Sequence, residues 1–262
     1  MKAIVLAAGE GKRLQPLTLS SPKCLVNLFG KSILEWQLQV FRSCNINDIS
    51  IVTGYLKDMI KFDDVTYFEN PKFSTTNMVE TLFCAKDKLE DSVIVSYGDI
   101  IYQKDVLQKL INSKDDISVV IDKKWKKYWE IRTTQLLNDV ESLVLEDGFI
   151  QNIGQKVSSL DEIEGQYIGL MKFQNEGLEF LKTFYHSAKN ESHLGNIMNP
   201  DIPFEKSYMT DLLQGLINSG CKLKAVLIEN GWLELDNYHD YEVYNKKFKD
   251  KTIFEFFSLN QL

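Results

Sequence analysis

The first 23 residues contain the pattern with the clearest chemical meaning in this sequence. An apolar run at 3–8 is followed by Gly9-Glu10-Gly11, where two glycines let the backbone turn sharply and approach a ligand without an intervening Cβ atom. Lys12, Arg13 and Lys23 add three positive charges. A glycine-bearing loop with exposed N–H groups and several cations is suited to a polyphosphate. An ordinary turn with solvated basic residues is the alternative, and the combination of strand, glycines and cations favours the phosphate loop.

Two common phosphate-binding motifs do not fit this stretch. The P-loop needs four residues between its two glycines, whereas Glu10 alone separates Gly9 from Gly11. The dinucleotide fingerprint needs a third glycine three residues after the second, and that position is occupied by Leu14. The expected ligand is therefore a phosphate chain bound in some other way.

Three carboxylates lie where apolar segments end. Asp99 follows Gly98 at the end of an expected strand at 91–99, where a buried, unpaired carboxylate would be costly. A turn aspartate in a Gly-Asp pair is the simpler alternative. Glu234 and Asp236 are two positions apart in an expected strand, so both point to one face and repel each other unless a positive charge lies between them.

A repeating strand–helix pattern is expected to position these residues. The strand at 3–8, a helix after the Ser32/Glu35 capping box and a strand at 46–53 form a βαβ unit, which implies a parallel sheet. Ligands of such sheets bind at the carboxyl ends of the strands, where the glycine loop lies. Further strands are expected at 65–71, 117–122, 165–173 and 223–228, helices at 78–88, 105–113, 177–190 and 208–220, and a hairpin at 142–155 around an Asp-Gly turn.

The segment 123–130 is aromatic and basic and has two interpretations. It could form a nucleic-acid patch, but lysines in an otherwise acidic chain more often form a solvated face. Trp125 and Trp129 are four positions apart and could equally belong to the core.

Composition narrows the class of protein. The chain has 262 residues, 44% hydrophobic and 26% charged, which is typical of a globular protein with a sizeable core. Its net charge of −7 argues against nucleic-acid binding. The four cysteines form no C-x-x-C pair, so we expect reduced thiols and neither a zinc site nor disulfides. We expect no secretion signal, no membrane segment and a cytoplasmic location.

The opening stretch resembles the signature of nucleotidyltransferases that activate phosphorylated metabolites. That signature reads Leu-x-x-Gly-x-Gly-x-Arg-Leu-x-Pro-Leu-Thr followed by Pro-Lys, and every fixed position is present between Leu6 and Lys23. The Gly98-Asp99 pair and the late Glu234-x-Asp236 also match. The resemblance implies a three-layer αβα Rossmann-like fold with a mostly parallel central sheet and a small β/α insertion on the acceptor side. One domain is expected over 1–262, with a nucleotide-binding half at 1–120 and an acceptor-binding half at 121–262.

The resemblance also assigns roles to residues. It implies that the loop wraps the NTP phosphates, that Arg13 stabilises the pyrophosphate leaving group, and that Lys23 contacts phosphate near the α-phosphorus. It assigns a Mg²⁺ site to Asp99 and Asp236. The nucleotide-binding residues it implies are Leu6, Ala8, Gly9, Glu10, Gly11, Lys12, Thr76, Asn77 and Gly98. The acceptor-binding residues are Trp129, Glu130, Arg132, Tyr167, Gly169, Tyr208, Asp211 and Glu234.

Two of these assignments have structural alternatives of similar weight. Thr76 and Asn77 would also be good capping residues for the helix that follows. Tyr208 and Asp211 share a helix face and could simply be a surface pair.

Several segments resemble the small cytidylyltransferases, which include enzymes for choline phosphate, phosphonates and phosphoglutamine. They are Thr-Thr-Asn-Met, Gln-Tyr-Ile-Gly-Leu and Tyr-Met-Thr-Asp-Leu-Leu. The expected partners are CTP and a small phosphorylated metabolite, neither nucleic acid nor membrane, and a homodimer remains open. Phospho-L-glutamine is the first choice, because Glu130 and Arg132 beside Trp129 offer both signs of charge to an amino acid. The product would serve surface-polysaccharide modification. Choline phosphate, phosphonate and sugar 1-phosphate acceptors, or a non-catalytic nucleotide-sensing domain, are the alternatives.

Overall fold

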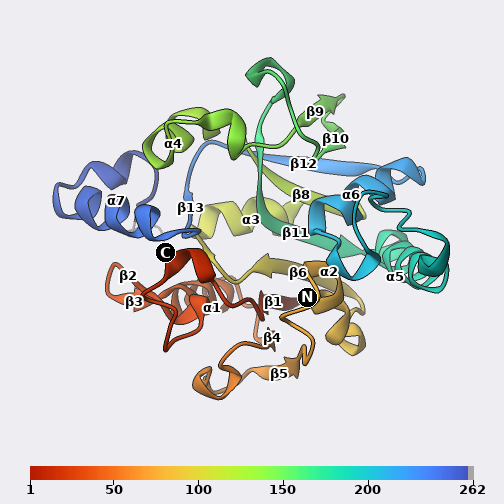
Figure 1. Cartoon of the computed structure of the whole chain (residues 1–262), viewed down its shortest axis with the longest axis horizontal. Helices are drawn as coiled ribbons and strands as arrows, with labels where there is room; N and C mark the ends of the chain where they lie inside the picture. The colour runs from red at the N-terminus through yellow and green to blue at the C-terminus, as the bar shows by residue number, and fades with distance from the viewer. Residues whose placement is uncertain (259–262) are drawn as a thin grey trace.

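A nine-stranded sheet forms the centre of the computed structural model, which describes residues 1–258 (Figure 1). Its spatial order is β5-β4-β1-β6-β11-β8-β12-β10-β9, and β10 and β11 run opposite to the other strands. The strands are β1 (Lys2–Ala7), β4 (Asp48–Thr53), β5 (Thr66–Glu69), β6 (Ser92–Tyr97), β8 (Ile117–Asp122), β9 (Leu143–Glu146), β10 (Phe149–Ile153), β11 (Gln166–Gln174) and β12 (Leu223–Ile228).

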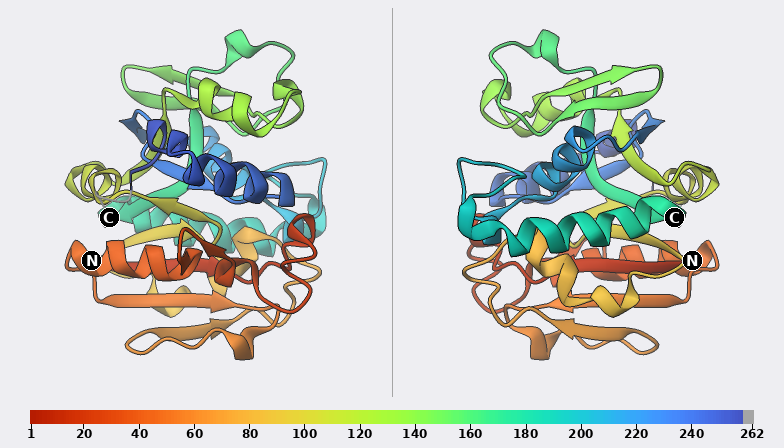
Figure 2. Two further views of the ribbon diagram at one scale, coloured as in Figure 1. Left: turned by 90° about the vertical axis from the view of Figure 1, so that its left-hand side faces the viewer. Right: turned by 90° about the vertical axis from the view of Figure 1, so that its right-hand side faces the viewer.

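Helices cover both faces of this sheet, so the fold has the three αβα layers expected from the sequence (Figure 2). One face carries α1 (Ile33–Ser43), α3 (Lys104–Asn112), α4 (Trp125–Arg132) and α7 (Tyr238–Lys249). The other carries α2 (Met78–Cys84), α5 (Asn175–Asn190) and α6 (Met209–Asn218). The two hydrophobic cores lie between these helices and the sheet. Among the described residues, no helix is both long and apolar enough to cross a membrane.

Local sequence signals explain where α1 begins and how it packs. The backbone N–H of Glu35 donates to Ser32 Oγ at 3.2 Å, and the Glu35 carboxylate accepts from the Ser32 N–H at 2.7 Å, which confirms the capping box. Ile33, Leu34 and Phe41 then bury their side chains against the sheet. Each such burial stabilises the fold by about 1.5–3 kcal/mol.

The expected hairpin at 142–155 is present as β9 and β10. Its turn contains Asp147 and Gly148, both with positive φ. Strand β10 pairs with β12 through Phe149 and Ile150, so the hairpin extends the edge of the central sheet. With α4, it forms the small insertion beside the second half of the sheet.

The aromatic and basic segment differs from the nucleic-acid patch considered above. Helix α4 places Lys126 and Lys127 in solvent and buries Trp125 and Trp129 in the core. This arrangement confirms the alternative in which the tryptophans are core residues. The expected helix at 78–88 also ends early, at Cys84, and a 3₁₀ turn at Lys86–Lys88 follows.

A short two-stranded ladder outside the main sheet joins distant parts of the chain. Strand β7 (Ile100–Tyr102) pairs antiparallel with β13 (Trp232–Glu234), with Ile100 opposite Glu234. A second small ladder pairs β2 (Asn27–Leu28) with β3 (Lys31–Ser32). The β7–β13 ladder matters most for the site, because it places the segment after Asp99 directly beside the segment before Asp236.

Candidate active site

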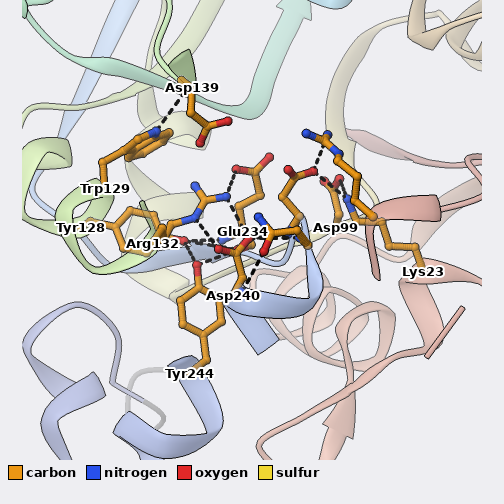
Figure 3. A network of polar contacts seen from close by, with 12 residues as sticks. Lys23, Asp99, Tyr128, Trp129, Arg132, Asp139, Glu234, Asp240 and Tyr244 are labelled. Atoms are coloured by element: carbon orange, nitrogen blue, oxygen red, sulfur yellow. Dashed lines mark hydrogen bonds and ion pairs between the residues drawn. The ribbon is translucent and has the colours of Figure 1, made fainter. Parts of the chain in front are cut away.

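Four charged side chains that are far apart in the sequence meet at the carboxyl ends of the central strands (Figure 3). Lys23 Nζ lies 2.7 Å from Asp99 Oδ2 and 3.4 Å from Asp236 Oδ1. Arg13 Nη2 lies 2.6 Å from the same Asp236 oxygen. The cluster combines the two carboxylates and two cations to which the sequence assigned metal binding and catalysis.

The loop after β1 is folded back on itself so that Lys23 reaches the site. Gly11 has a φ of 62°, and a Cβ atom there would lie 3.0 Å from Lys23 Cβ. Thr18 Oγ1 donates to the Gly11 carbonyl at 2.8 Å, and Tyr55 OH donates to the Thr18 carbonyl at 3.1 Å. Gly9 differs, because a Cβ atom there would meet nothing within 4 Å. Its open surroundings leave room for a ligand against the backbone.

The turn that carries Asp99 is held tightly on both sides. A Cβ atom at Gly98 would lie 2.6 Å from the Leu6 carbonyl oxygen, so only glycine fits between β6 and β1. The buried side chain of Gln37, on α1, donates to the carbonyls of Tyr97 at 2.8 Å and Ile100 at 2.7 Å. These two carbonyls bracket the Gly98-Asp99 turn.

Asp99, Glu234 and Asp236 have the chemistry of a divalent-metal site. One carboxylate oxygen from each lies within 4.8 Å of the others. Asp99 Oδ1 is buried and has no hydrogen-bond partner among the described residues. Several carboxylate oxygens around one point fit a hard cation such as Mg²⁺. The sequence had placed Glu234 with the acceptor, and the structure places it in this carboxylate cluster as well.

The electrostatics of the cluster are strongly coupled. Burial disfavours the charge of Lys23, but the carboxylates of Asp99, Asp236 and Glu234 outweigh it and raise the pKa of the ammonium above 10.5. Burial also raises the pKa of Glu234 to about 7; Arg132 opposes this rise, and the charges of Asp236 and Asp99 add to it.

A cavity that is open to solvent lies next to this cluster. Its walls include Lys23 and Asp99, together with six of the residues assigned to the nucleotide: Leu6, Ala8, Gly9, Thr76, Asn77 and Gly98.

Glu10 and Lys12, the other charged residues of the glycine loop, lie away from the cavity walls. Glu10 is partly exposed, and its carboxylate pairs with the ammonium of the solvent-exposed Lys12 at 2.5 Å.

Asn77 caps α2, and both Thr76 and Asn77 lie on the cavity wall. Asn77 Oδ1 accepts from the Met78 N–H at 2.9 Å at the start of α2, and Asn77 Nδ2 donates to the Lys206 carbonyl at 3.2 Å. Thr76 Oγ1 instead donates to the Lys72 carbonyl in the preceding loop. The capping alternative is therefore confirmed for Asn77, and base contact remains a prediction for both residues.

The acceptor residues assigned to α4 are not brought together as expected. The buried ring of Trp129 is covered by the Arg132 guanidinium, which lies 5.0 Å from the ring centroid. Arg132 is itself buried and forms ion pairs with Glu234 at 2.9 Å and Asp240 at 3.1 Å. Glu130 is exposed on the same helix. It therefore does not supply the negative charge beside Trp129 that the sequence suggested.

Tyr208 and Asp211 form a helix cap. The Asp211 carboxylate is buried and accepts from the Tyr208 N–H at 2.7 Å and from Asn199 Nδ2 at 2.9 Å. Tyr208 has an exposed side chain. The pair is therefore a helix cap with a buried carboxylate and not a surface pair, and its assignment to the acceptor stays a prediction.

Tyr167 and Gly169 lie beside the nucleotide cavity, next to Tyr97 on its wall. The ring centroids of Tyr97 and Tyr167 are 5.7 Å apart. A Cβ atom at Gly169, where φ is +83°, would lie 2.6 Å from the Tyr97 ring. Gly169 therefore makes room for that ring, and Tyr167 and Gly169 border the region where an acceptor would lie.

Sequence reasoning missed Asp139 and Glu141. The carboxylate of Asp139 points toward the space near Arg132 and Glu234 (Figure 3). The side chains of Asp139 and Glu141 are both exposed, yet the surrounding protein partly desolvates them. This desolvation raises the pKa of Asp139, while Arg132 opposes the rise. Partial desolvation, together with the charges of Asp211 and Asp139, raises the pKa of Glu141 to about 7. Both residues precede the hairpin in an irregular segment, so no spacing pattern could have identified them.

Sequence reasoning also missed Asp240, although the residues around it contain a recognisable pattern. The Asn237-x-x-Asp240 spacing is a capping box at the start of α7. The buried Asp240 carboxylate accepts from the N–H groups of Asp236 at 2.9 Å and Asn237 at 3.2 Å.

Comparisons with known proteins agree with this geometry. Residues 3–159 match the family described as the MobA-like NTP transferase domain. The CTP:phosphoglutamine cytidylyltransferase of Campylobacter jejuni subsp. jejuni serotype O:2 is 41% identical over 94% of this chain and 100% of that protein. The choline-phosphate cytidylyltransferase of Streptococcus pneumoniae is 35% identical over 39% of this chain and 47% of that protein.

Solved structures show the same fold. A CTP:phosphocholine cytidylyltransferase from Streptococcus pneumoniae aligns with a TM-score of 0.69 at 23% identity, covering 94% of this chain and 98% of that one. A glucose-1-phosphate thymidylyltransferase from Bacillus anthracis, described as putative, aligns with a TM-score of 0.70 at 18% identity and covers 95% and 96%.

Proposed function

Because the chain belongs to the nucleotidyltransferases that carry a MobA-like NTP transferase domain, we propose that it transfers a cytidylyl group from CTP to a small phosphorylated metabolite. Phospho-L-glutamine is the first choice of acceptor. The observation that carries the proposal is the meeting of Arg13, Lys23, Asp99 and Asp236 beside the cavity that the glycine loop lines. The full-length relative that acts on phosphoglutamine supports the choice of substrates.

The reaction follows from the charges at the site. An oxygen of the acceptor phosphate forms a bond to the α-phosphorus of CTP, and the bond from that phosphorus to the bridging oxygen breaks. The electron pair leaves with pyrophosphate. Arg13 and Lys23 neutralise negative charge that grows on the phosphates in the transition state. A phosphate oxygen is the nucleophile, so no side chain needs to attack.

Mg²⁺ is the metal that we propose for the carboxylate cluster. Asp99 and Asp236 would hold it, with Glu234 as a third oxygen donor. When bound, the ion would polarise the α-phosphate and neutralise part of its charge. In the structure the Lys23 ammonium lies between Asp99 and Asp236, so Lys23 also limits the repulsion between these carboxylates.

Arg132 favours an amino-acid acceptor over choline. A quaternary ammonium is best bound by free aromatic faces with nearby carboxylates. Here the Arg132 guanidinium already covers the rings of Trp129 and Tyr128, at 5.0 Å and 5.4 Å from their centroids. A choline group would have to displace a buried ion pair. We therefore propose that Tyr167, Gly169 and Glu234 form the acceptor side, while Arg132 acts through the groups that it holds.

A substrate screen tests this function. CTP, UTP, GTP and dTTP are each combined with phosphoglutamine, phosphocholine and glucose 1-phosphate, and pyrophosphate release is measured. We expect the fastest turnover with CTP and phosphoglutamine. No turnover with CTP would sink the cytidylyl assignment, and faster turnover with another acceptor would replace phosphoglutamine.

Choline phosphate is the second candidate acceptor, because two relatives are named for it. Phosphonates and sugar 1-phosphates follow. A nucleotide-sensing domain without catalysis would be expected to lack an essential charged group, whereas Arg13, Lys23, Asp99 and Asp236 are all present. CTP binding without pyrophosphate release from any acceptor in the screen would favour the sensing domain.

The proposal extends to cellular context. We propose that the reaction takes place in the cytoplasm, with small metabolites and neither nucleic acid nor membrane as partners, and that its product serves surface-polysaccharide modification. A homodimer remains open, and light scattering of the purified protein measures it directly.

A further inference from the structure

A buried arginine lies behind the carboxylate cluster. The side chain of Arg132 is 2% exposed, and its Nε and Nη2 atoms donate to the two oxygens of Asp240 at 3.2 Å and 3.1 Å. Nη2 also lies 2.9 Å from Glu234 Oε2. One planar guanidinium therefore fixes two carboxylates at once, a geometry that the point charge of a lysine ammonium does not reproduce.

Two tyrosines fix the backbone at the Glu234 end of this contact. Tyr128 OH accepts from the Glu234 N–H at 2.8 Å, and Tyr244 OH donates to the Glu234 carbonyl at 2.8 Å. The two hydroxyls lie 2.5 Å from each other. The guanidinium packs over the ring of Tyr128 as well as that of Trp129. The Glu234 carboxylate is thus held by Arg132 through Oε2, while its other oxygen is not engaged in that ion pair.

The ion pair between Arg132 and Asp240 connects Arg132 to the segment that carries Asp236. The same Asp240 oxygen that faces Nη2 accepts the N–H groups of Asp236 and Asn237. Arg132 therefore orients the Asp240 carboxylate (Figure 3), which in turn accepts the peptide N–H of Asp236. Asp99 is tied to the same segment, because the Leu235 N–H donates to its carbonyl at 2.9 Å.

We propose that Arg132 is a positioning residue of the nucleotidyl-transfer site. It sets the direction of the Glu234 carboxylate and, through Asp240, the backbone of Asp236, so that both face the same point as Asp99. This inference rests on the proposed function, but its test measures metal binding and needs no acceptor. A purely structural ion pair is the competing explanation. That explanation predicts lower stability without a specific effect on the metal site.

Metal affinity tests the proposal directly. Mn²⁺ binding to the full chain is titrated by electron paramagnetic resonance, with and without CTP, in Arg132→Ala and Arg132→Lys. We expect Arg132→Ala to raise the Mn²⁺ Kd about tenfold to a hundredfold, as is usual when a residue that orients metal ligands is removed. Arg132→Lys keeps the charge but cannot bridge Asp240 and Glu234 in the same way, so it should remain weakened.

Chemical rescue separates positioning from general stability. Removing the Arg132 side chain leaves space between two aromatic faces and two carboxylates, and the guanidinium ion matches the group removed. Millimolar guanidinium chloride should restore Mn²⁺ binding in Arg132→Ala but not in Arg132→Lys. Arg42→Ala is the matched control, because Arg42 is exposed and its guanidinium donates to the Asp63 carbonyl at 3.0 Å, away from the carboxylate cluster. It should bind Mn²⁺ as the unsubstituted protein does.

The proposal fails if folded Arg132→Ala binds Mn²⁺ within twofold of the unsubstituted protein, or if guanidinium restores nothing. Should Arg132→Ala not fold, the same titration of Arg132→Lys decides, and an unchanged Kd rejects the proposal. A protein that releases no pyrophosphate from any acceptor would refute the proposed function, whereas the dependence of Mn²⁺ binding on Arg132 would still be measured.

Discussion

The ammonium of Lys23 lies between the carboxylates of Asp99 and Asp236, which would otherwise repel each other. Asp99 is the closer partner, at 2.7 Å, and keeps one buried oxygen without a partner among the described residues. Such an oxygen is costly in a purely structural aspartate and useful in a metal ligand. These contacts lead to a prediction about Asp99.

Replacing Asp99 with Asn should separate catalysis from stability. The substitution removes a carboxylate that we propose as a metal ligand and should lower kcat by about a thousandfold or more, whereas Lys23 keeps Asp236 as a partner. The melting temperature should therefore change little. Steady-state kinetics and thermal unfolding measure the two effects, with the exposed Asp58→Asn as control. A collapse in melting temperature would instead make Asp99 a structural residue.

Glu141 gives a prediction about pH. Its side chain is exposed, but partial desolvation by the surrounding protein, together with the charges of Asp211 and Asp139, raises its pKa in the folded protein to about 7 from an ordinary value of 4.5. The folded state therefore binds this proton more tightly than the unfolded state, and its stability falls as pH rises through the window from 4.5 to 7. Glu141→Gln removes the charge, so it should raise the melting temperature at pH 8 more than at pH 4.5.

Thermal unfolding at the two pH values checks this sign. Glu146→Gln, an exposed glutamate of the adjacent hairpin, is the control and should shift both melting temperatures alike. Equal shifts for Glu141→Gln would show that folding does not raise the pKa of the Glu141 carboxyl group.

At the scale of elements, α1 does more than cover the sheet. It places Gln37 in the core, where the side-chain amide bonds the carbonyls on both sides of the Asp99 turn. Ser96 Oγ donates to its Oε1 at 2.9 Å, so this amide holds three groups near the end of β6.

Gln37→Leu should therefore weaken both the fold and the site. Two buried carbonyls lose their donor, which should cost about 2 kcal/mol or more in the free energy of unfolding. The Asp99 turn also loses its support, so we expect kcat to fall about tenfold. Urea denaturation and kinetics measure the two changes. Gln39→Leu on the more exposed side of α1 is the control, and an unchanged kcat in Gln37→Leu would contradict a role in positioning.

The elements that the sequence predicted are those with strong local signals. Short local patterns predict these elements: an apolar run for the strand at 117–122, turn residues for Asp147-Gly148, and a capping box for Ser32. The β7–β13 ladder could not be predicted, because each strand has three residues and exists through its pairing with the other. The same applies to Gln37, whose partners lie on distant segments. The signature residues were identifiable because one contiguous stretch carries them, whereas the residues that the resemblance assigned to the acceptor lie on several separate segments.

At the scale of the whole molecule, one continuous sheet joins the two halves of the chain. Strand β11, from the second half, pairs with β6 of the first half and with β8. Both halves also contribute to the same carboxylate cluster. The sequence predicts a single domain over 1–262, and an unfolding experiment can test this prediction.

We expect urea to unfold the protein in one transition. Trp36 reports on the first half, and Trp232, in β13, reports on the second. Variants that retain one of these tryptophans should show the same fluorescence midpoint, equal to that of far-ultraviolet circular dichroism. Two separated midpoints would mean that the halves unfold as independent domains.

The ion pair between Arg13 and Asp236 also has a consequence for biosynthesis. Its partners are 223 positions apart, so the ribosome makes the glycine loop long before its carboxylate partner. At about 5–20 residues per second, the interval lasts on the order of tens of seconds. During translation the glycine loop is therefore made without its partner, and Arg13 can pair with Asp236 only after the segment that follows β13 has been synthesised.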